Sequence, residues 1–220
     1  MVGSPEINKV IRRTLSPVLR ESGFARTQTR NNWGWHGPCT WVLNICAVGH
    51  YFNLVTGWPS MSVGVCFAVM YDFIPPRFPD RIKTTPQGKL LPQYFQCEQS
   101  QHLDVGINQR KYTLELGIPA ERARTDIWWI ERDGSNMEGA IEDIARQFVV
   151  QAFPWFERKS DIPAAYAENE AGLDCLGKFS RGAYFAKYLK REDEFRGYVA
   201  KLEQEAHRIE HPMPVIEYGD

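Results

Sequence analysis

The 220-residue chain is 43% hydrophobic and 24% charged, which is typical of one globular domain, alone or with an appendage. Its formal net charge of −1 predicts no general attraction to nucleic acid or anionic lipid. The five cysteines form no CxxC pair, which argues against a disulfide framework or a zinc ribbon and favours a reduced, cytoplasmic protein.

The first half of the chain predicts one helix followed by strands. Apolar residues recur at helical spacing from Ile7 to Leu19, with Pro17 inside the helix and Gly23 as its cap. Residues 24–30 alternate as a strand does, and Asn31 and Asn32 indicate a turn. Central strands are expected over residues 41–48 and 62–73, joined by an exposed turn.

The second half begins irregular and becomes helical. Five prolines in residues 74–93 predict a long loop, whose role the sequence leaves open. Two further strands are expected over 112–116 and 127–131, and then a helix from 137 to about 153, where Pro154 stops or bends it. Amphipathic patterns predict helices over 162–176, 179–191 and 195–209.

One helix, a run of strands and a run of helices together predict an α+β fold. We expect an antiparallel sheet of about five strands, with the N-terminal helix and the C-terminal helices packed on it. Residues 1–160 are assigned to an α+β domain, and residues 161–220 to a C-terminal helical extension packed on that domain. No stretch of about 18 uninterrupted apolar residues occurs, so we expect no membrane-spanning segment.

Several short segments resemble a known family. They are "ESGF" at the end of the first helix, "WVLNI", "SVGV", "DIWWIE" and "AFPWFER". Over roughly residues 5–160 the chain resembles the bacterial domain-of-unknown-function family 4304. The resemblance implies a small bacterial cytosolic protein, in a family some of whose members are suspected of being toxin-neutralising immunity proteins. It implies no established activity, catalytic residue or cofactor, and this chain adds a C-terminal extension and the proline-rich loop.

The sequence lacks the common catalytic and cofactor motifs. GxSxG, HExxH, EF-hand spacing, GxGxxG and GxxxxGK[ST] do not occur, so we expect no catalytic residue, no metal site and no cofactor. Cys46 and Cys66 fall within apolar strands and are interpreted as inert core thiols. Cys39 follows His36 in "HGPC", which leaves a less favoured hypothesis of a thiolate activated by imidazole.

Tryptophans concentrate in residues 31–58, which hold four of the seven. Trp41 is expected in a buried strand, and the others in loops or at strand ends. Loop tryptophans either fold down as lids or serve at an interface. The residues predicted to contact a partner are Trp33, Trp35, His36 and Trp58.

The leading hypothesis is a non-catalytic protein-binding module, of which an immunity-type protein is one form. Its partner would be another protein, with no nucleic acid and no membrane, and the oligomeric state is left open. The basic stretch 178–191 is interpreted as solvated cations above core aromatics. The alternative is an enzyme or small-ligand-binding protein with a cleft between the sheet and the C-terminal helices. That cleft would use His36 or His102 with scattered carboxylates, which are Asp72, Asp104, Glu115, Asp126 and Glu131.

Overall fold

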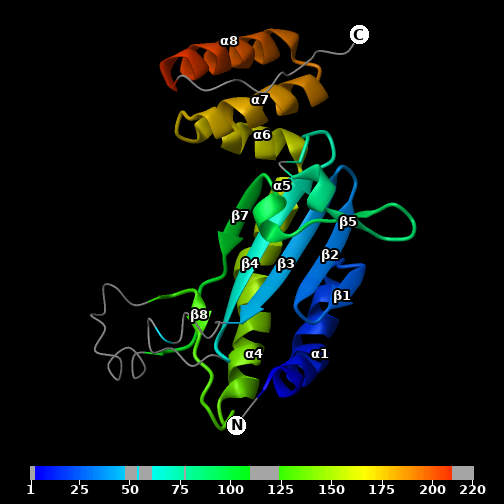
Figure 1. The fold of residues 1–220 in the computed structure, drawn as a ribbon, viewed down its shortest axis with the longest axis vertical. Helices are drawn as coiled ribbons and strands as arrows, with labels where there is room; N and C mark the ends of the chain where they lie inside the picture. The colour runs from blue at the N-terminus through cyan, green and yellow to red at the C-terminus, as the bar shows by residue number, and fades with distance from the viewer. Residues whose placement is uncertain (1–2, 48–53, 55–60, 77, 110–123, 210–220) are drawn as a thin grey trace.

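The computed structural model describes residues 3–47, 54, 61–76, 78–109 and 124–209. It confirms the α+β prediction, because a six-stranded antiparallel sheet packs with an N-terminal helix and with helices from the second half of the chain (Figure 1). The strand predicted over 112–116 lies outside the described residues.

Helix α1 (Ser4–Glu21) forms where the sequence carries an apolar stripe at helical spacing. Its buried hydrophobic residues are Ile7, Val10, Ile11, Leu15 and Leu19. The helix continues through Pro17, and the chain then turns at Gly23, whose φ of 95° lies in the left-handed region that favours glycine.

The sheet is built mainly from strands that follow one another in the chain. They are β1 (Arg26–Gln28), β2 (Asn31–His36), β3 (Cys39–Ala47) and β4 (Val63–Tyr71). Two shorter strands, β7 (Gln99–His102) and β8 (Ile127–Trp128), pair with different parts of β4. The order is β1-β2-β3-β4-β7, with β8 also beside β4.

Strand β2 corrects the predicted turn at Asn31 and Asn32. The turn lies at residues 29–30, where Thr29 has a φ of 37°. Both asparagines already pair with β3. Trp33 and Trp35 therefore belong to a strand rather than to a loop. The alternation Trp-x-Trp places both indoles on one face of the sheet, which is the pattern of a half-covered strand.

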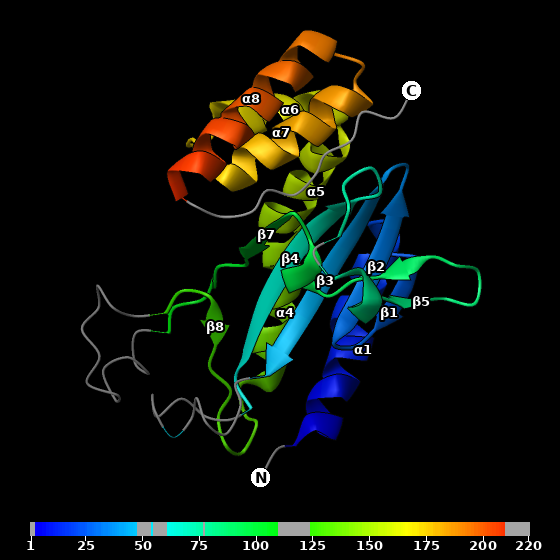
Figure 2. The same cartoon turned by 45° about the horizontal axis from the view of Figure 1, so that its top comes forward.

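One face of the sheet is sealed by helices and forms the main core. Helices α1 and α4 (Met137–Gln147) lie side by side across it (Figure 2). From the two central strands, the core includes Trp41, Leu43, Ile45, Val65, Phe67 and Val69. Aromatic rings fill the space between the layers, and the rings of Trp41 and Phe156 stack with centroids 4.8 Å apart.

The helix that begins at Met137 changes its winding instead of ending near Phe153. A π-helical turn (Phe148–Ala152) leads into α5 (Phe153–Ser160). Pro154 has no N–H to donate to the carbonyl four residues earlier, and a wider turn at this point accommodates that missing bond. Phe148 and Phe156, on either side of the change, are both fully buried.

A buried carboxylate ties β8 and the chain after β7 to helix α4. Asp143 is fully buried, and it accepts hydrogen bonds from the backbone N–H groups of Gly106 (2.8 Å) and Ile107 (3.2 Å). It also accepts one from Trp128 Nε1 at 2.9 Å. A buried charge is tolerated when it is hydrogen-bonded in this way, so Asp143 fastens the edge of the sheet.

The opposite face of the sheet is covered only in part, by residues 74–93, which we call the proline-rich segment. The sequence predicts an irregular loop here, and the structure adds a small hairpin of β5 (Lys83–Thr84) and β6 (Leu90–Leu91). A second, smaller core forms beneath it, consisting of Trp33, Val42, Ala68, Met70 and Cys97.

The last three helices stack at one end of the sheet (Figure 1). They are α6 (Ile162–Ala171), α7 (Leu176–Tyr188) and α8 (Glu192–Ile209). Tyr71, at the end of β4, connects the two parts: its ring centroid lies 4.9 Å from that of Phe185, and its hydroxyl donates to the Lys159 carbonyl at 3.1 Å.

Candidate functional site

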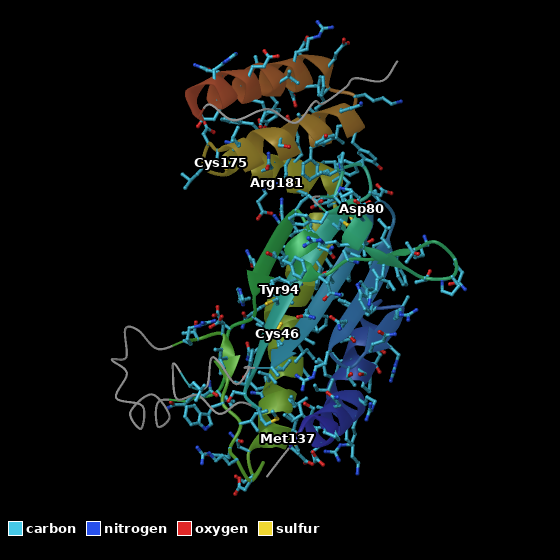
Figure 3. The ribbon with its side chains drawn as sticks, in the orientation of Figure 1. Cys46, Asp80, Tyr94, Met137, Cys175 and Arg181 are labelled. Carbon is cyan, nitrogen blue, oxygen red and sulfur yellow. The ribbon has the colours of Figure 1, made fainter. Side chains whose placement is uncertain are left out.

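The partly covered face of the sheet changes from apolar to polar along the central strands. On β3, Val42 is followed on this face by Asn44 and Cys46, and on β4 the neighbour of Ala68 is Cys66. Tyr94 lies over these strands near Cys46, beyond the proline-rich segment (Figure 3). The polar groups thus begin where the apolar cover ends.

The strand register brings two cysteines and a histidine together. Cys46 pairs with Gly64 and Cys66 pairs with Asn44, so the cysteines are diagonal neighbours on one face. Their hydrogen-bond partners differ, because Cys46 Sγ donates to Asn44 Oδ1 and Cys66 Sγ lies 3.5 Å from His102 Nδ1. On the other side of β4, Cys66 pairs with His102 of β7.

The histidine connects the thiols to a carboxylate. Its Nδ1 lies 3.5 Å from Cys66 Sγ and 3.3 Å from Asp126 Oδ2. Arg124 donates two hydrogen bonds of 2.6 Å to Asp126. Burial raises the pKa of Asp126, but these bonds and the charge of Arg124 outweigh that effect and hold the pKa below its ordinary value. We call Cys46, Cys66, His102, Arg124 and Asp126 the thiol cluster.

The two thiols of the cluster differ in acidity. The neighbouring Cys66 thiol and the positive charge of Arg30 outweigh burial and lower the pKa of Cys46 to about 7. The neighbouring Cys46 thiol, together with burial, raises the pKa of Cys66 far above its ordinary value. Cys46 is therefore the more acidic thiol of the pair.

Asn44 acts against the ionisation of Cys46. Its Oδ1 accepts a hydrogen bond from the Cys46 thiol, and its Nδ2 donates to the Arg30 carbonyl at 3.2 Å. An amide oxygen favours the protonated thiol, because it would repel a thiolate. The contact must weaken when Cys46 ionises, so Asn44 limits the effect of Cys66 and Arg30.

The cluster differs from the relay of a cysteine hydrolase. In such a relay the imidazole uses one nitrogen for the nucleophile and the other for the carboxylate. Here Cys66 and Asp126 both face Nδ1 of His102. Cys66 and Asp126 therefore compete for one nitrogen, and the relay geometry is not reproduced.

The remaining cysteines show what burial alone does to a thiol. Burial raises the pKa of Cys39 to about 12 and raises the pKa of Cys97 well above its ordinary value. The hypothesis of an activated thiolate in "HGPC" is therefore wrong. The prediction that Cys46 lies in the core is also wrong, because Cys46 is half-buried, and its pKa is lowered.

The structure places the predicted partner-binding tryptophans beneath the proline-rich segment. Trp33 is 4% exposed, and its Nε1 donates to the Pro92 carbonyl at 2.8 Å. Trp35 is half-buried, and its Nε1 donates to the Leu90 carbonyl at 3.2 Å. A partner could reach Trp33 only if this segment moved away. Their role in binding stays a prediction.

The other two predicted residues are not brought to the same place. His36 stacks on Trp41, with ring centroids 3.7 Å apart, on the helix-covered side of the sheet. Burial lowers the pKa of His36, and the nearby Gly23 backbone only partly opposes this. Trp58 lies outside the described residues.

Hollows do occur between the sheet and the C-terminal helices, where the alternative hypothesis expects a cleft. One of about 390 Å³ lies between β7 and helices α5 and α7, and one of about 340 Å³ lies beside Pro75. Cations that line them are already engaged: Lys159 Nζ lies 2.7 Å from Glu168, and Arg181 donates to Asn169 at 3.2 Å. These charges support the packing of the helices.

Within the described part of the chain, no three His, Cys, Asp or Glu side chains are arranged to hold a metal ion. Its helices are each too short or too polar to cross a lipid bilayer.

Sequence reasoning missed the thiol cluster because it missed β7. This strand reads Gln-Ser-Gln-His, is largely exposed and lies at an edge, so it has no apolar alternation to reveal it. Without β7, His102 was an isolated histidine and Asp126 one of several scattered carboxylates. Strand alternation in the two central segments was the usable signal, because it places Cys46 and Asn44 on one face.

No family model matches the chain, and no curated protein or solved structure matches it. The resemblance to the domain-of-unknown-function family 4304 therefore stays a prediction, and a functional proposal has to be built from the thiol cluster.

Proposed function

We propose that the protein is a thiol-dependent enzyme whose nucleophile is the thiolate of Cys46. The main support is the position of Cys46, which is half-buried and lies beside the Cys66 thiol and near the cation of Arg30. The thiolate, not the thiol, is the reactive form of cysteine. With a pKa of about 7, close to half of Cys46 is ionised at neutral pH.

The contrast with the buried cysteines supports a chemical role. Cys39 and Cys97 are surrounded so that burial dominates and the thiol is kept neutral. Cys46 lies in the same strand as Cys39 but has the Cys66 thiol and a cation beside it. Electropositive, partly exposed surroundings of this kind are typical of reactive cysteines. Reduced thiols also fit the cytoplasmic location that the sequence predicts.

A non-catalytic protein-binding module is the second candidate function. Phe78 and Phe95 support it, because they are 46% and 55% exposed and lie in or just after the proline-rich segment. Exposed aromatic side chains favour contact with a partner. The bacterial origin and the immunity-type role suggested by the resemblance belong to this candidate. The thiol cluster is the stronger basis, since it brings ionisable groups together.

The proposal is tested by the pH dependence of alkylation. The native protein is treated with iodoacetamide between pH 5 and pH 10, and the modified cysteines are identified by mass spectrometry. We expect the rate at Cys46 to reach half its maximum near pH 7, because only the thiolate reacts. Cys175 is exposed and reports on reagent access in the same samples.

Two matched substitutions serve as controls. Cys66→Ala removes the neighbouring thiol that lowers the pKa of Cys46, so the midpoint should move upward toward that of an ordinary thiol, about 8.5. Cys97→Ala makes the same chemical change beneath the proline-rich segment and should leave the midpoint unchanged. A Cys46 that reacts only after unfolding, or a midpoint unaffected by Cys66→Ala, would refute the proposal.

A further inference from the structure

We infer that the outer edge of β7 binds an extended peptide that carries an acidic side chain. The peptide would add a strand to the sheet, and its acidic side chain would enter the hollow between β7 and helices α5 and α7. This inference goes beyond the thiol chemistry proposed above and does not depend on Cys46.

Strand β7 forms an edge of the sheet among the described residues. It pairs with β4, and the strand order β1-β2-β3-β4-β7 ends there. In Figure 1 β7 lies at the left margin of the sheet, with its far edge turned away from β4. An edge of this kind presents backbone N–H and C=O groups that a further strand can bind.

The register with β4 shows which residues of β7 present those groups. The Leu103 N–H donates to the Val65 carbonyl at 2.9 Å, so Leu103 and every second residue before it bond to β4. Ser100 and His102 are the alternate residues, and they direct their N–H and C=O groups outward. A peptide strand that lies along β7 can therefore bond to the backbone at these two positions.

A glutamine side chain already pairs with this edge just beyond β7. Gln151 Oε1 accepts a hydrogen bond from the Asp104 N–H at 3.1 Å, and Gln151 Nε2 donates one to the Asp104 carbonyl at 3.0 Å. These are the two bonds that a neighbouring strand would make at an outward-facing residue. Among the described strands, none makes the corresponding bonds at Ser100 and His102.

The hollow of about 390 Å³ lies beside the same edge and indicates which side chain the peptide carries. Ser100 of β7 lines it, together with Trp155 and Lys159 of α5. Its charged lining residues are Glu98, Lys159 and Arg181, two cations and one anion, which sum to +1. A carboxylate complements this charge, whereas an ammonium group would be repelled.

An unsatisfied donor in the lining also favours a carboxylate. Trp155 is 3% exposed, and its Nε1 has no hydrogen-bond partner within the part of the chain that the structure describes. Lys159 Nζ lies 5.6 Å from the centroid of the Trp155 ring. The ammonium has three N–H donors, and its bond to Glu168 uses one of them. A carboxylate beside these two side chains can accept hydrogen bonds from both.

The first test uses random seven-residue peptides displayed on phage and selected on the folded full-length protein. We expect the selected sequences to be rich in β-favouring residues and to share one Asp or Glu. The best of them is then synthesised with a fluorescent label, and its Kd is measured by anisotropy. A selection that yields no binder, or binders without a shared acidic position, would contradict the inference.

Backbone pairing is tested first by altering the peptide. Methyl groups are placed on its backbone nitrogens at every second residue, in either of the two possible sets. One set should weaken binding by about tenfold or more, and the other should change it by less than about twofold, because only one set of N–H groups faces β7. Equal effects of the two sets would show that the peptide does not bind as a strand.

Backbone pairing is tested next by altering β7. Ser100→Pro removes an outward N–H without removing a bond to β4, and an edge strand tolerates proline at such a position. The Kd of the peptide should rise about tenfold. Ser100→Ala keeps the N–H and is the matched control, with an unchanged Kd. Thermal unfolding checks that both variants are folded, and equal Kd values for the two would place the peptide elsewhere.

The charge of the hollow is tested by replacing the shared acidic residue of the peptide with its amide. This change should weaken binding to the unaltered protein by about tenfold, because a charged hydrogen bond is lost. Lys159→Met should abolish the difference between the two peptides while leaving the Kd of the amide peptide nearly unchanged. An undiminished preference for the acidic peptide in Lys159→Met would show that its side chain does not enter this hollow.

A second copy of this chain is the competing occupant of the edge. Sedimentation equilibrium of the unaltered protein and of Ser100→Pro should give the mass of a monomer for both. A dimer that Ser100→Pro dissociates would show that β7 pairs with another copy and would overturn the peptide inference. None of these measurements involves alkylation of Cys46, so the inference and the proposed function fail separately.

Discussion

The two faces of strands β3 and β4 differ in polarity, although both faces are formed by the same two strands, with successive residues pointing to opposite sides. One face carries Leu43, Ile45 and Phe67 into the core beneath α1 and α4. The other carries Cys46 and Cys66, which meet the charged and polar groups of the thiol cluster. Alternation by two residues separates the two faces.

The difference between the two faces lies in how completely each one is covered by other parts of the chain. The helix-covered face is fully occupied by packing, and a polar group there, such as Asp143, is held by several donors. On the other face the proline-rich segment covers only one end, over Trp33 and Val42. Partial cover leaves sulphur and imidazole groups near both protein charges and solvent, where their protonation can change.

The largest expected effect separates the two faces directly. Phe67→Ala should reduce the free energy of unfolding by about 3–5 kcal/mol, because it opens a cavity among packed rings. Its neighbour in sequence, Cys66→Ala, should cost only about 1 kcal/mol, since one sulphur is removed at the edge of the core. Urea unfolding measures both values. Similar losses in the two variants would contradict the contrast between the faces.

The cover formed by the proline-rich segment is tested by Trp33→Ala. We expect a loss of about 3 kcal/mol in the free energy of unfolding, because a buried indole and its bond to Pro92 disappear. Trp35→Ala removes a half-buried indole and should cost less. An unchanged thermal midpoint for Trp33→Ala would place Trp33 at the surface, as the partner-binding prediction requires.

The link between α4 and the open edge of the sheet depends on Asp143. Asp143→Ala should lower the free energy of unfolding by about 2–3 kcal/mol, because it leaves buried donors such as Trp128 Nε1 without an acceptor. Glu142→Ala changes the exposed neighbour and serves as the matched control, with little expected effect. Equal stability of the two variants would show that the buried carboxylate is not structurally important.

The smallest effects concern the acidity of Cys46, measured by its alkylation rate at pH 7. Arg30→Gln removes the nearby cation, so the pKa of Cys46 should rise and the rate should fall about two- to fivefold. Asn44→Ala removes the oxygen that favours the neutral thiol and should raise the rate. Close to half of Cys46 is already ionised, so that gain cannot exceed about twofold. Changes of the opposite sign would show that other groups control this thiol.

Much of the fold could be predicted because its signals are local. The stripe from Ile7 to Leu19 and the apolar runs that became β3 and β4 each specify their own element. Strand β2 could not be read correctly, because Asn31 and Asn32 have turn-forming preferences that pairing with β3 overrides. The β5–β6 hairpin, hidden among prolines, is likewise stabilised by contact with Trp33 and Trp35 rather than by its own sequence.

The sequence by itself determined that this protein is an α+β protein and which strand residues alternate between two faces. Only the tertiary structure decided that Cys46, Cys66, His102 and Asp126 meet, because their neighbourhood depends on strands paired across long stretches of chain. Periodicity is set within a few residues, whereas the register between distant strands is set by the packing of the whole sheet. The chemistry of a thiol follows from its neighbours, so it could not be read from a cysteine in an apolar run.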